Sequence, residues 1–143
     1  MKDFSSLISK EYRKNTLDFN SAKILYATSQ SDKALKILLT NEFKDTLWNL
    51  NAKFLVLKIL LESKDFELFD VQFKAYKTYI RRQKNIGYHK TYFTNVCNAF
   101  MILTDANKNK KKYQTYLFDK QTPDVDWFNK AIMDIVKTKK APK

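Results

Sequence analysis

Apolar residues along this chain recur at intervals of three and four, the spacing that gathers side chains on one face of an α-helix. The clearest example runs from Trp48 to Arg82. Its first half is apolar around most of a helical circumference, through Trp48, Leu50, Ala52, Phe54, Leu55, Leu57, Ile59 and Leu61. Such a pattern predicts a buried central helix.

The second half of this segment predicts an amphipathic helix that covers the first. Its apolar stripe consists of Phe66, Phe69, Phe73, Tyr76 and Ile80. Between the two halves the apolar pattern breaks at Ser63, Lys64 and Asp65, where the Asp65 carboxylate can cap the N-terminus of the second helix. The chain is therefore expected to reverse there and to form a helical hairpin.

Shorter patterns predict further helices on both sides of this hairpin. On the N-terminal side they cover 2–14, 19–29 and 34–40, with a break at 15–18 and with Ser31 or Asp32 as the cap of the third helix. On the C-terminal side they cover 88–106 and 122–138, where Thr122 supplies a capping hydroxyl and Pro123 suits the first helical position. Residues 107–112 fit either a loop or the start of a short helix that carries Tyr113, Tyr116, Leu117 and Phe118. The sum is about eight helices joined by short connections.

Composition narrows the fold class. The 143 residues include one Gly and two Pro, too few for the tight turns of an all-β protein. Hydrophobic residues make up 44% and aromatic residues 15%, enough for a packed core without a metal or disulfide. We therefore expect one all-α domain over 1–143. It would comprise an N-terminal helix at 1–14, core hairpins at 18–106, a closing helix at 122–138 and a basic tail at 139–143.

The predicted hairpins repeat along the chain. Aligning their turns places Ala34 opposite Phe69, a spacing of 35 residues. The first hairpin alternates small and large residues at Ala22, Leu25, Ala34 and Leu38, and further similarity lies in LNAKFLVLKILLESKDFELFD, YIRRQKNI and YHKTYFTNV. In these features 26–103 resembles divergent bacterial proteins of the tetratricopeptide-repeat superfamily, whose period is similar.

This resemblance implies a fold and a general role. The fold would be a short tetratricopeptide-like α-solenoid of stacked antiparallel hairpins, and the role that of a protein-binding scaffold. The second hairpin departs from the family's pattern, with Leu57, Phe69 and Tyr76 where small side chains are preferred. We therefore expect its two helices to pack more widely than in a regular repeat.

The positive charge of the chain is locally concentrated. Twenty-seven Lys and Arg against 15 Asp and Glu give a formal charge of +12, and no acidic residue occurs between Val71 and Thr104. Within that segment the predicted partner-binding residues are Lys74, Lys77, Arg81, Arg82, Lys84, Tyr88 and Lys90. The spacing of Lys74, Lys77, Arg81 and Lys84 places these four cations along one helix face. Such a face can bind an acidic partner, and the alternative is a solvated, lysine-rich surface.

The sequence offers no clear catalytic or metal-binding arrangement. His89 is the only histidine, and Cys97, the only cysteine, lies on the apolar side of its helix, as a small core residue would. The acidic pairs, Asp65 with Glu67 and Asp124 with Asp126, stand at predicted helix starts, where capping explains them. One glycine cannot form a phosphate-binding loop. We therefore expect no enzymatic activity, no cofactor and no metal.

These observations predict a cytoplasmic interaction module that does not enter the membrane. Its partner would be a protein or acidic peptide segment. That partner would lie in a concave groove lined by the first helix of each hairpin, or on the basic face around 74–84. The alternative function is nucleic-acid binding, through the same cations, the cluster at 108–112 and stacking on Tyr79, Tyr88 and Tyr92. The scarcity of arginine, with only three in the chain, weighs against this alternative.

Overall fold

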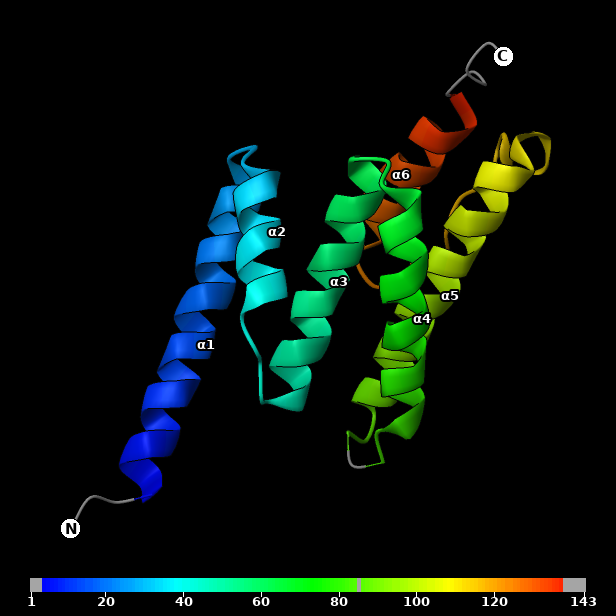
Figure 1. Cartoon of the computed structure of the whole chain (residues 1–143). Helices are drawn as coiled ribbons and strands as arrows, with labels where there is room; N and C mark the ends of the chain where they lie inside the picture. The colour runs from blue at the N-terminus through cyan, green and yellow to red at the C-terminus, as the bar shows by residue number, and fades with distance from the viewer. Residues whose placement is uncertain (1–3, 85, 138–143) are drawn as a thin grey trace. The chain divides into compact units, whose positions relative to one another are not determined.

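The computed structural model describes residues 4–84 and 86–137, and within these ranges regular secondary structure is entirely helical (Figure 1). Its elements are α1 (Phe4–Ala27), α2 (Ser31–Thr40), α3 (Thr46–Glu62), α4 (Phe66–Arg82), α5 (His89–Lys108), the 3₁₀ helix η1 (Lys110–Tyr113) and α6 (Val125–Lys137). The all-α prediction is confirmed for this part of the chain, with fewer helices than the eight or so expected. The predicted basic tail at 139–143 lies outside the described residues.

The chain forms two compact units, which divide within α4. The first is Met1–Tyr79 and the second Ile80–Lys143. Each has its own fully buried side chains, including Leu50 and Tyr76 in the first unit and Phe100 and Phe128 in the second. Burial of these large apolar groups is the main stabilising contribution within each unit.

The first two predicted helices are one continuous helix, α1, so the predicted break at 15–18 is wrong. Asn15, Phe19 and Ala22 recur at intervals of four and three, and all three are buried. The polar residues around Asn15 lower the helix propensity, but the segment contains neither glycine nor proline. Burial of this row therefore outweighs the weak local preference.

The α1–α2 and α3–α4 turns share one backbone geometry. In each turn a residue with positive φ follows the helix: Ser29 at 64° and Lys64 at 61°. Its amide donates to the carbonyl three residues back, and the next amide donates to the carbonyl five residues back. Both helices thus end in a Schellman motif. The two motifs lie 35 residues apart, the spacing expected from the alignment of the hairpins.

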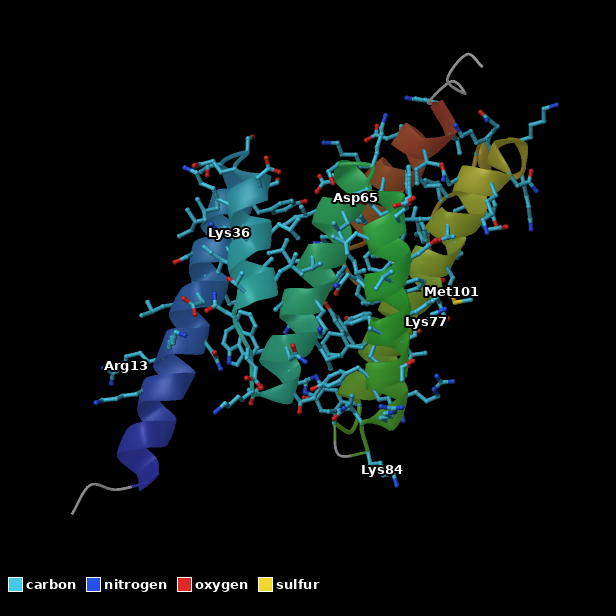
Figure 2. All side chains as sticks on the ribbon, in the orientation of Figure 1. Arg13, Lys36, Asp65, Lys77, Lys84 and Met101 are labelled. Atoms are coloured by element: carbon cyan, nitrogen blue, oxygen red, sulfur yellow. The ribbon has the colours of Figure 1, made fainter. Side chains whose placement is uncertain are left out.

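Aspartate side chains cap both helices of the second hairpin. The Asp45 carboxylate accepts from the Trp48 amide at 3.1 Å, and that of Asp65 accepts from the Leu68 amide at 3.3 Å. The predicted cap at Asp65, which lies in the α3–α4 turn (Figure 2), is confirmed. In contrast, α2 follows Gln30, which makes no side-chain capping bond, so the predicted cap at residue 31 or 32 is wrong.

The two hairpins differ in how closely their helices pack. The backbones of α1 and α2 lie close together, and Ala22 and Ala34 between them are fully buried. The backbones of α3 and α4 approach much less, because Leu57, Phe69 and Tyr76 are buried in the second hairpin. The Tyr76 hydroxyl crosses the gap and donates to the Leu50 carbonyl at 3.2 Å. The predicted wider packing of this hairpin is confirmed.

Contacts near both ends of α3 join the hairpins of the first unit. At the start of α3, the Phe19 ring from α1 lies 6.4 Å from the Phe43 ring and 5.1 Å from the Trp48 ring, edge-on to both. At its end, the Tyr26 hydroxyl donates to Glu62 Oε1 at 2.6 Å. Since Phe19 precedes Tyr26 along α1 just as Trp48 precedes Glu62 along α3, the two helices run parallel.

Aromatic packing between α5 and α6 builds the second unit. The rings of Phe100 and Phe128 lie 5.0 Å apart at 71°, and Phe118, from the segment between η1 and α6, lies 5.4 Å from Phe128. Cys97 is buried on α5, as predicted. Of the short helix predicted to start in 107–112, only η1 forms, and it ends at Tyr113, so Tyr116, Leu117 and Phe118 lie beyond it.

The predicted start of the closing helix is wrong. Thr122 and Pro123 precede α6, which begins at Val125. Asp124 has a φ of 53°, and its carbonyl accepts the amides of Trp127 and Phe128. The backbone turn at Asp124, rather than the Thr122 hydroxyl, therefore defines this helix start. Residue 138 of the predicted helix lies outside the described residues.

Candidate interaction site

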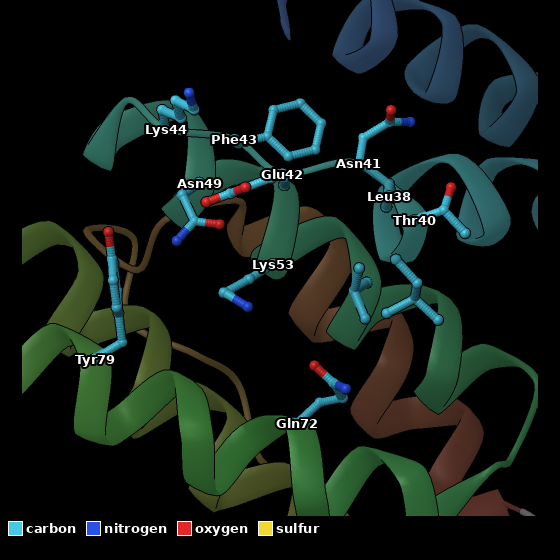
Figure 3. A pocket seen from close by; sticks show the side chains of 13 residues that line it. Leu38, Thr40, Asn41, Glu42, Phe43, Lys44, Asn49, Lys53, Gln72 and Tyr79 are labelled. Atoms are coloured by element: carbon cyan, nitrogen blue, oxygen red, sulfur yellow. The ribbon is translucent and has the colours of Figure 1, made fainter.

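The first unit carries an open groove of about 660 Å³ bounded by α2, the 41–45 connection, α3 and α4 (Figure 3). The connection is partly extended, with Asn41 at φ −102° and ψ 141°, so it leads away from α2 before α3 begins. The wide separation of α3 and α4 leaves one flank of α3 uncovered. The extended connection and the uncovered flank of α3 both belong to the first unit, as do all residues that line the groove.

Each wall of the groove comes from one face of a helix. The floor is the α3 face formed by Asn49, Ala52, Lys53 and Val56, which recur at intervals of three, one and three. Leu38 and Leu39 close the α2 side. Gln72 and Tyr79, seven residues apart on one flank of α4, close the other side. The groove is thus apolar near α2 and polar near α4.

Polar groups converge on the groove from two helices. Figure 3 shows Asn49 and Lys53 of α3 and Gln72 of α4 facing the same space. Within residues 4–84 and 86–137, these three side chains make no hydrogen bond or ion pair with the protein. Amide groups can both donate and accept, and the lysine donates only. The site can therefore take a ligand with acceptors and at least one negative charge.

The charges that line the groove are one acid and two cations. Glu42 and Lys44 lie on the 41–45 connection, and Lys53 lies on the α3 floor. The net charge of the groove lining is therefore positive, although smaller than the net charge of the predicted basic face around 74–84. A carboxylate entering near Lys53 would form a charge-assisted hydrogen bond in a partly buried setting.

This groove differs from the one expected from the sequence. The expected groove is lined by the first helix of each hairpin, α1 and α3. The observed groove combines α3 with α2 and α4, the second helices of the two hairpins. The wider packing of the second hairpin was expected, but not its consequence: the large side chains separate α4 from α3 and open this side of α3.

The predicted partner-binding residues of the first unit lie outside the groove. Lys74 is exposed, and Lys77 is half-buried with its Nζ 4.7 Å from the centre of the Phe73 ring (Figure 2). Helical spacing places both on the flank of α4 opposite to Gln72 and Tyr79. The basic row and the groove therefore offer two separate surfaces on the same helix.

The other predicted partner-binding residues belong to the second unit. Arg81, Arg82, Lys84, Tyr88 and Lys90 are all exposed around the connection between α4 and α5. Lys90 is tied to that connection, because its Nζ donates to the carbonyls of Arg81 at 3.5 Å and Gln83 at 3.2 Å. The structure thus divides the seven predicted residues between two units.

Sequence reasoning missed Lys53 and Gln72 as site residues. Lys53 interrupts the most apolar helix, and that interruption was the available signal. The signal is ambiguous, because Lys58 interrupts the same helix and its Nζ lies 4.7 Å from the Phe54 ring instead of facing the groove. Only the positions of α2 and α4 distinguish these two lysines.

The remaining candidate residues have structural surroundings. His89 is half-buried with its ring 4.3 Å from that of Tyr88. In the predicted cluster at 108–112, Lys112 Nζ lies 3.8 Å from Asp105 Oδ2 and over the Tyr113 ring. The Tyr113 hydroxyl also donates to Asp105, and this hydrogen bond raises the pKa of Tyr113. Among the described residues no three His, Cys, Asp or Glu side chains gather as a metal site would require.

Neither the helices themselves nor known proteins indicate a function for this chain. In the described helices, no stretch combines the length and apolar character needed to cross a bilayer. A comparison of the chain with protein-family models, curated proteins and solved structures finds no match. A function for this chain must therefore be inferred from its own geometry.

Proposed function

We propose that the chain is a non-enzymatic, cytoplasmic interaction module of the helical-repeat type. Its first unit would bind an extended, acidic segment of another protein in the groove bounded by α2, α3 and α4. The observation that carries this proposal is the convergence of Lys53, Asn49 and Gln72 on a groove whose other side is apolar. A lone, buried Cys97 suits a reducing compartment.

The groove matches the chemistry of an extended peptide. Such a segment presents backbone donors and acceptors, which the Asn49 and Gln72 amides can satisfy. A carboxylate on the segment would pair with Lys53, and an apolar side chain would pack against Leu38 and Val56. The volume of about 660 Å³ lies within the range of known ligand sites.

The repeated turns support the helical-repeat interpretation. Two Schellman motifs 35 residues apart end the first helices of two consecutive hairpins. This spacing is close to that of tetratricopeptide repeats, and helical repeats present extended surfaces to their partners. On this interpretation, the wide separation of α3 and α4 gives this chain a groove that a regularly packed repeat would lack.

A specific observation favours a second candidate function, nucleic-acid binding by the second unit. Tyr88 is 82% exposed and lies between α4 and α5 in the sequence segment that carries Arg81, Arg82, Lys84 and Lys90. An exposed ring among cations is typical of surfaces that bind nucleic acids by stacking and charge. This candidate uses a different unit from the groove, so the two functions can be tested separately.

The groove function is tested by selecting binders from a displayed library of random linear peptides. We expect the enriched peptides to contain acidic and apolar residues, and Lys53→Glu to weaken their binding about tenfold or more, as for loss of a charge-assisted contact. Lys74→Glu is the matched control, because it reverses an exposed lysine of the same unit outside the groove. Failure to enrich any peptide, or equal losses in both variants, would contradict the proposal.

A further inference from the structure

Four cations flank the connection between α4 and α5 in the second unit, and together they are called the basic corner: Arg81, Arg82, Lys84 and Lys90. Gly87 has a φ of 54°, and the amides of His89 and Lys90 donate to the carbonyls of Ile86 and Gly87. The two hydrogen bonds from Lys90 Nζ to the carbonyls of Arg81 and Gln83 close the corner from the α5 side. These bonds hold the Lys90 side chain beside the end of α4, which carries Arg81 and Arg82.

Two exposed tyrosines extend from this corner along α5. Tyr88 is 82% exposed, with its ring tilted by 33° against that of His89. Tyr92, one helical turn further, is 42% exposed and packs edge-on to Phe93. Rings of this kind bury large apolar area when a flat partner stacks on them. Their exposure beside a basic corner points to a partner with both flat rings and negative charge.

The tyrosines begin a stripe that leads into a pocket. Tyr88, Tyr92, Asn95, Ala99 and Ile102 recur at intervals of four and three and so share one flank of α5. At 1.5 Å per residue this stripe is about 21 Å long. Its last three residues line a pocket of about 280 Å³. Tyr88 and the pocket are thus the two ends of one helix flank, whereas Lys90 lies on the flank that faces the end of α4.

The pocket is built by the segment that precedes α6. Asn98 also lines the α5 side, and Tyr116, Phe118, Asp119, Gln121 and Thr122 line the other. The Phe118 amide donates to Asn129 Oδ1 at 2.9 Å, and the Gln121 amide donates to Asp119 Oδ1 at 2.8 Å. The Tyr116 ring packs edge-on to Phe118. These contacts hold the segment that forms the far wall of the pocket in place without a ligand.

The pocket has the polar groups that a nucleobase edge requires. Within residues 86–137 the side-chain amides of Asn95, Asn98 and Gln121 make no hydrogen bond to the protein. Amides of this kind pair with the donor and acceptor pattern of a base, while Tyr116, Phe118 and Ile102 can contact its faces. The Asp119 carboxylate disfavours a phosphate at this end and can accept from an exocyclic amino group.

We infer that the second unit binds a single-stranded nucleic acid, with its phosphates at the basic corner, a base stacked on Tyr88 and a further base in the α5 pocket. This inference rests on the nucleic-acid candidate above and adds strand type and base recognition to it. A duplex keeps its bases stacked and paired, so its bases could reach neither the Tyr88 ring nor the pocket. The groove of the first unit takes no part.

The test measures fluorescence anisotropy of labelled single strands of A, C or T, and of a duplex of equal length, against the full chain at several salt concentrations. We expect single strands to bind more tightly than the duplex and to weaken steeply as salt rises. Tyr88→Ala should lower single-strand affinity about tenfold, as for loss of one stacked base, while Tyr88→Phe should retain it.

Pocket variants test base recognition separately. Asn98→Ala and Gln121→Ala should reduce the preference among bases without changing the salt dependence, because neither residue carries a charge. Asn107→Ala is the matched control, an exposed asparagine of α5 away from the pocket. All four substituted side chains are exposed, and circular dichroism checks that each variant keeps its helices.

The outcomes separate the inference from the candidate on which it rests. If single strand and duplex bind alike and Tyr88→Ala has no effect, the second unit binds polyanions through charge and the inference is wrong. If polyglutamate competes as well as the oligonucleotides, the partner is an acidic protein and the inference is equally wrong. If no nucleic acid binds at low salt, the nucleic-acid candidate fails as well.

Discussion

The two hairpins of the first unit have the same turn but different interiors. Ser29 and Lys64 occupy equivalent positions in two Schellman motifs, yet α1 and α2 pack closely while α3 and α4 stand apart. The first hairpin buries Ala22 and Ala34 at its interface, and the second buries Phe69 and Tyr76. Turn geometry therefore fixes the reversal of the chain, and side-chain volume fixes the distance between the helices.

This difference has a functional consequence in our proposal. A close hairpin covers its own interface, whereas the wider α3–α4 hairpin leaves one flank of α3 open to the groove. Lys53 on that flank and Gln72 on α4 then face a common space. Variants that alter the interior of one hairpin should consequently change its stability and, for the second hairpin, the shape of the groove.

The largest expected effect is loss of the Phe69 ring from the wide hairpin. Phe69 is 2% exposed and stacks on Phe73 at 5.4 Å, so Phe69→Ala should lower the free energy of unfolding by about 3–5 kcal/mol. Denaturant unfolding followed by Trp48 fluorescence measures this in a Trp127→Phe background, where Trp48 reports on the first unit alone. Val71→Ala, at an exposed position of the same helix, should change stability by less than about 0.5 kcal/mol.

A near-zero effect of Phe69→Ala would show that the ring does not hold the second hairpin together. The comparison between hairpins would then lose its physical basis. An equal loss in Val71→Ala would instead indicate that α4 tolerates no truncation at all, exposed or buried.

Enlarging the close hairpin should be the next most costly change. Ala34 is fully buried where α1 and α2 approach, so Ala34→Leu should lower the free energy of unfolding by about 1–3 kcal/mol through overpacking. The same denaturant assay measures it. The control is Ala75→Leu on α4, where the side chain is exposed and the larger residue has room. A neutral Ala34→Leu would show that the first hairpin can open as the second does.

The smallest expected effect lies in the shared turns. Ser29 and Lys64 both adopt positive φ, which glycine accepts without strain, so Ser29→Gly and Lys64→Gly should each raise the free energy of unfolding by up to about 1 kcal/mol. Ala75→Gly, in a helix interior, should lower it by a similar amount. Clearly unequal gains at the two turns would show that the motifs are not equivalent despite their matching hydrogen bonds.

The second hairpin was predictable from sequence because its signals are local and agree. The apolar rows of α3 and α4, the break at 63–65 and the Asp65 cap all favour one reversal. Predictions failed where local and tertiary preferences diverged. At 15–18 burial of Asn15 and Phe19 extends a helix through polar residues, and at 122–124 the backbone of Asp124 starts α6 two residues later than the proline suggested.

The candidate sites show the same limit. Helical spacing placed Lys74 and Arg81 at exposed positions of α4, but Lys77 is half-buried and Lys84 lies beyond the end of that helix. The groove and the α5 pocket each combine residues from separate elements. Gln72 of α4 lines the same groove as Asn49 of α3, and Gln121 of the segment before α6 lines the same pocket as Asn98 of α5. Spacing along one helix carries no information about which other element faces it.

The amino-acid sequence alone determined the helical class, the positions of most reversals and the 35-residue spacing of the two hairpin turns, because these depend on propensity, periodicity and capping within a few residues. The tertiary structure decided how far apart the paired helices stand, and therefore which polar residues border a hollow. Lys53 and Lys58 differ little in sequence context, yet one faces the groove and the other covers a phenylalanine ring. The packing of distant side chains sets that difference, and no local pattern encodes it.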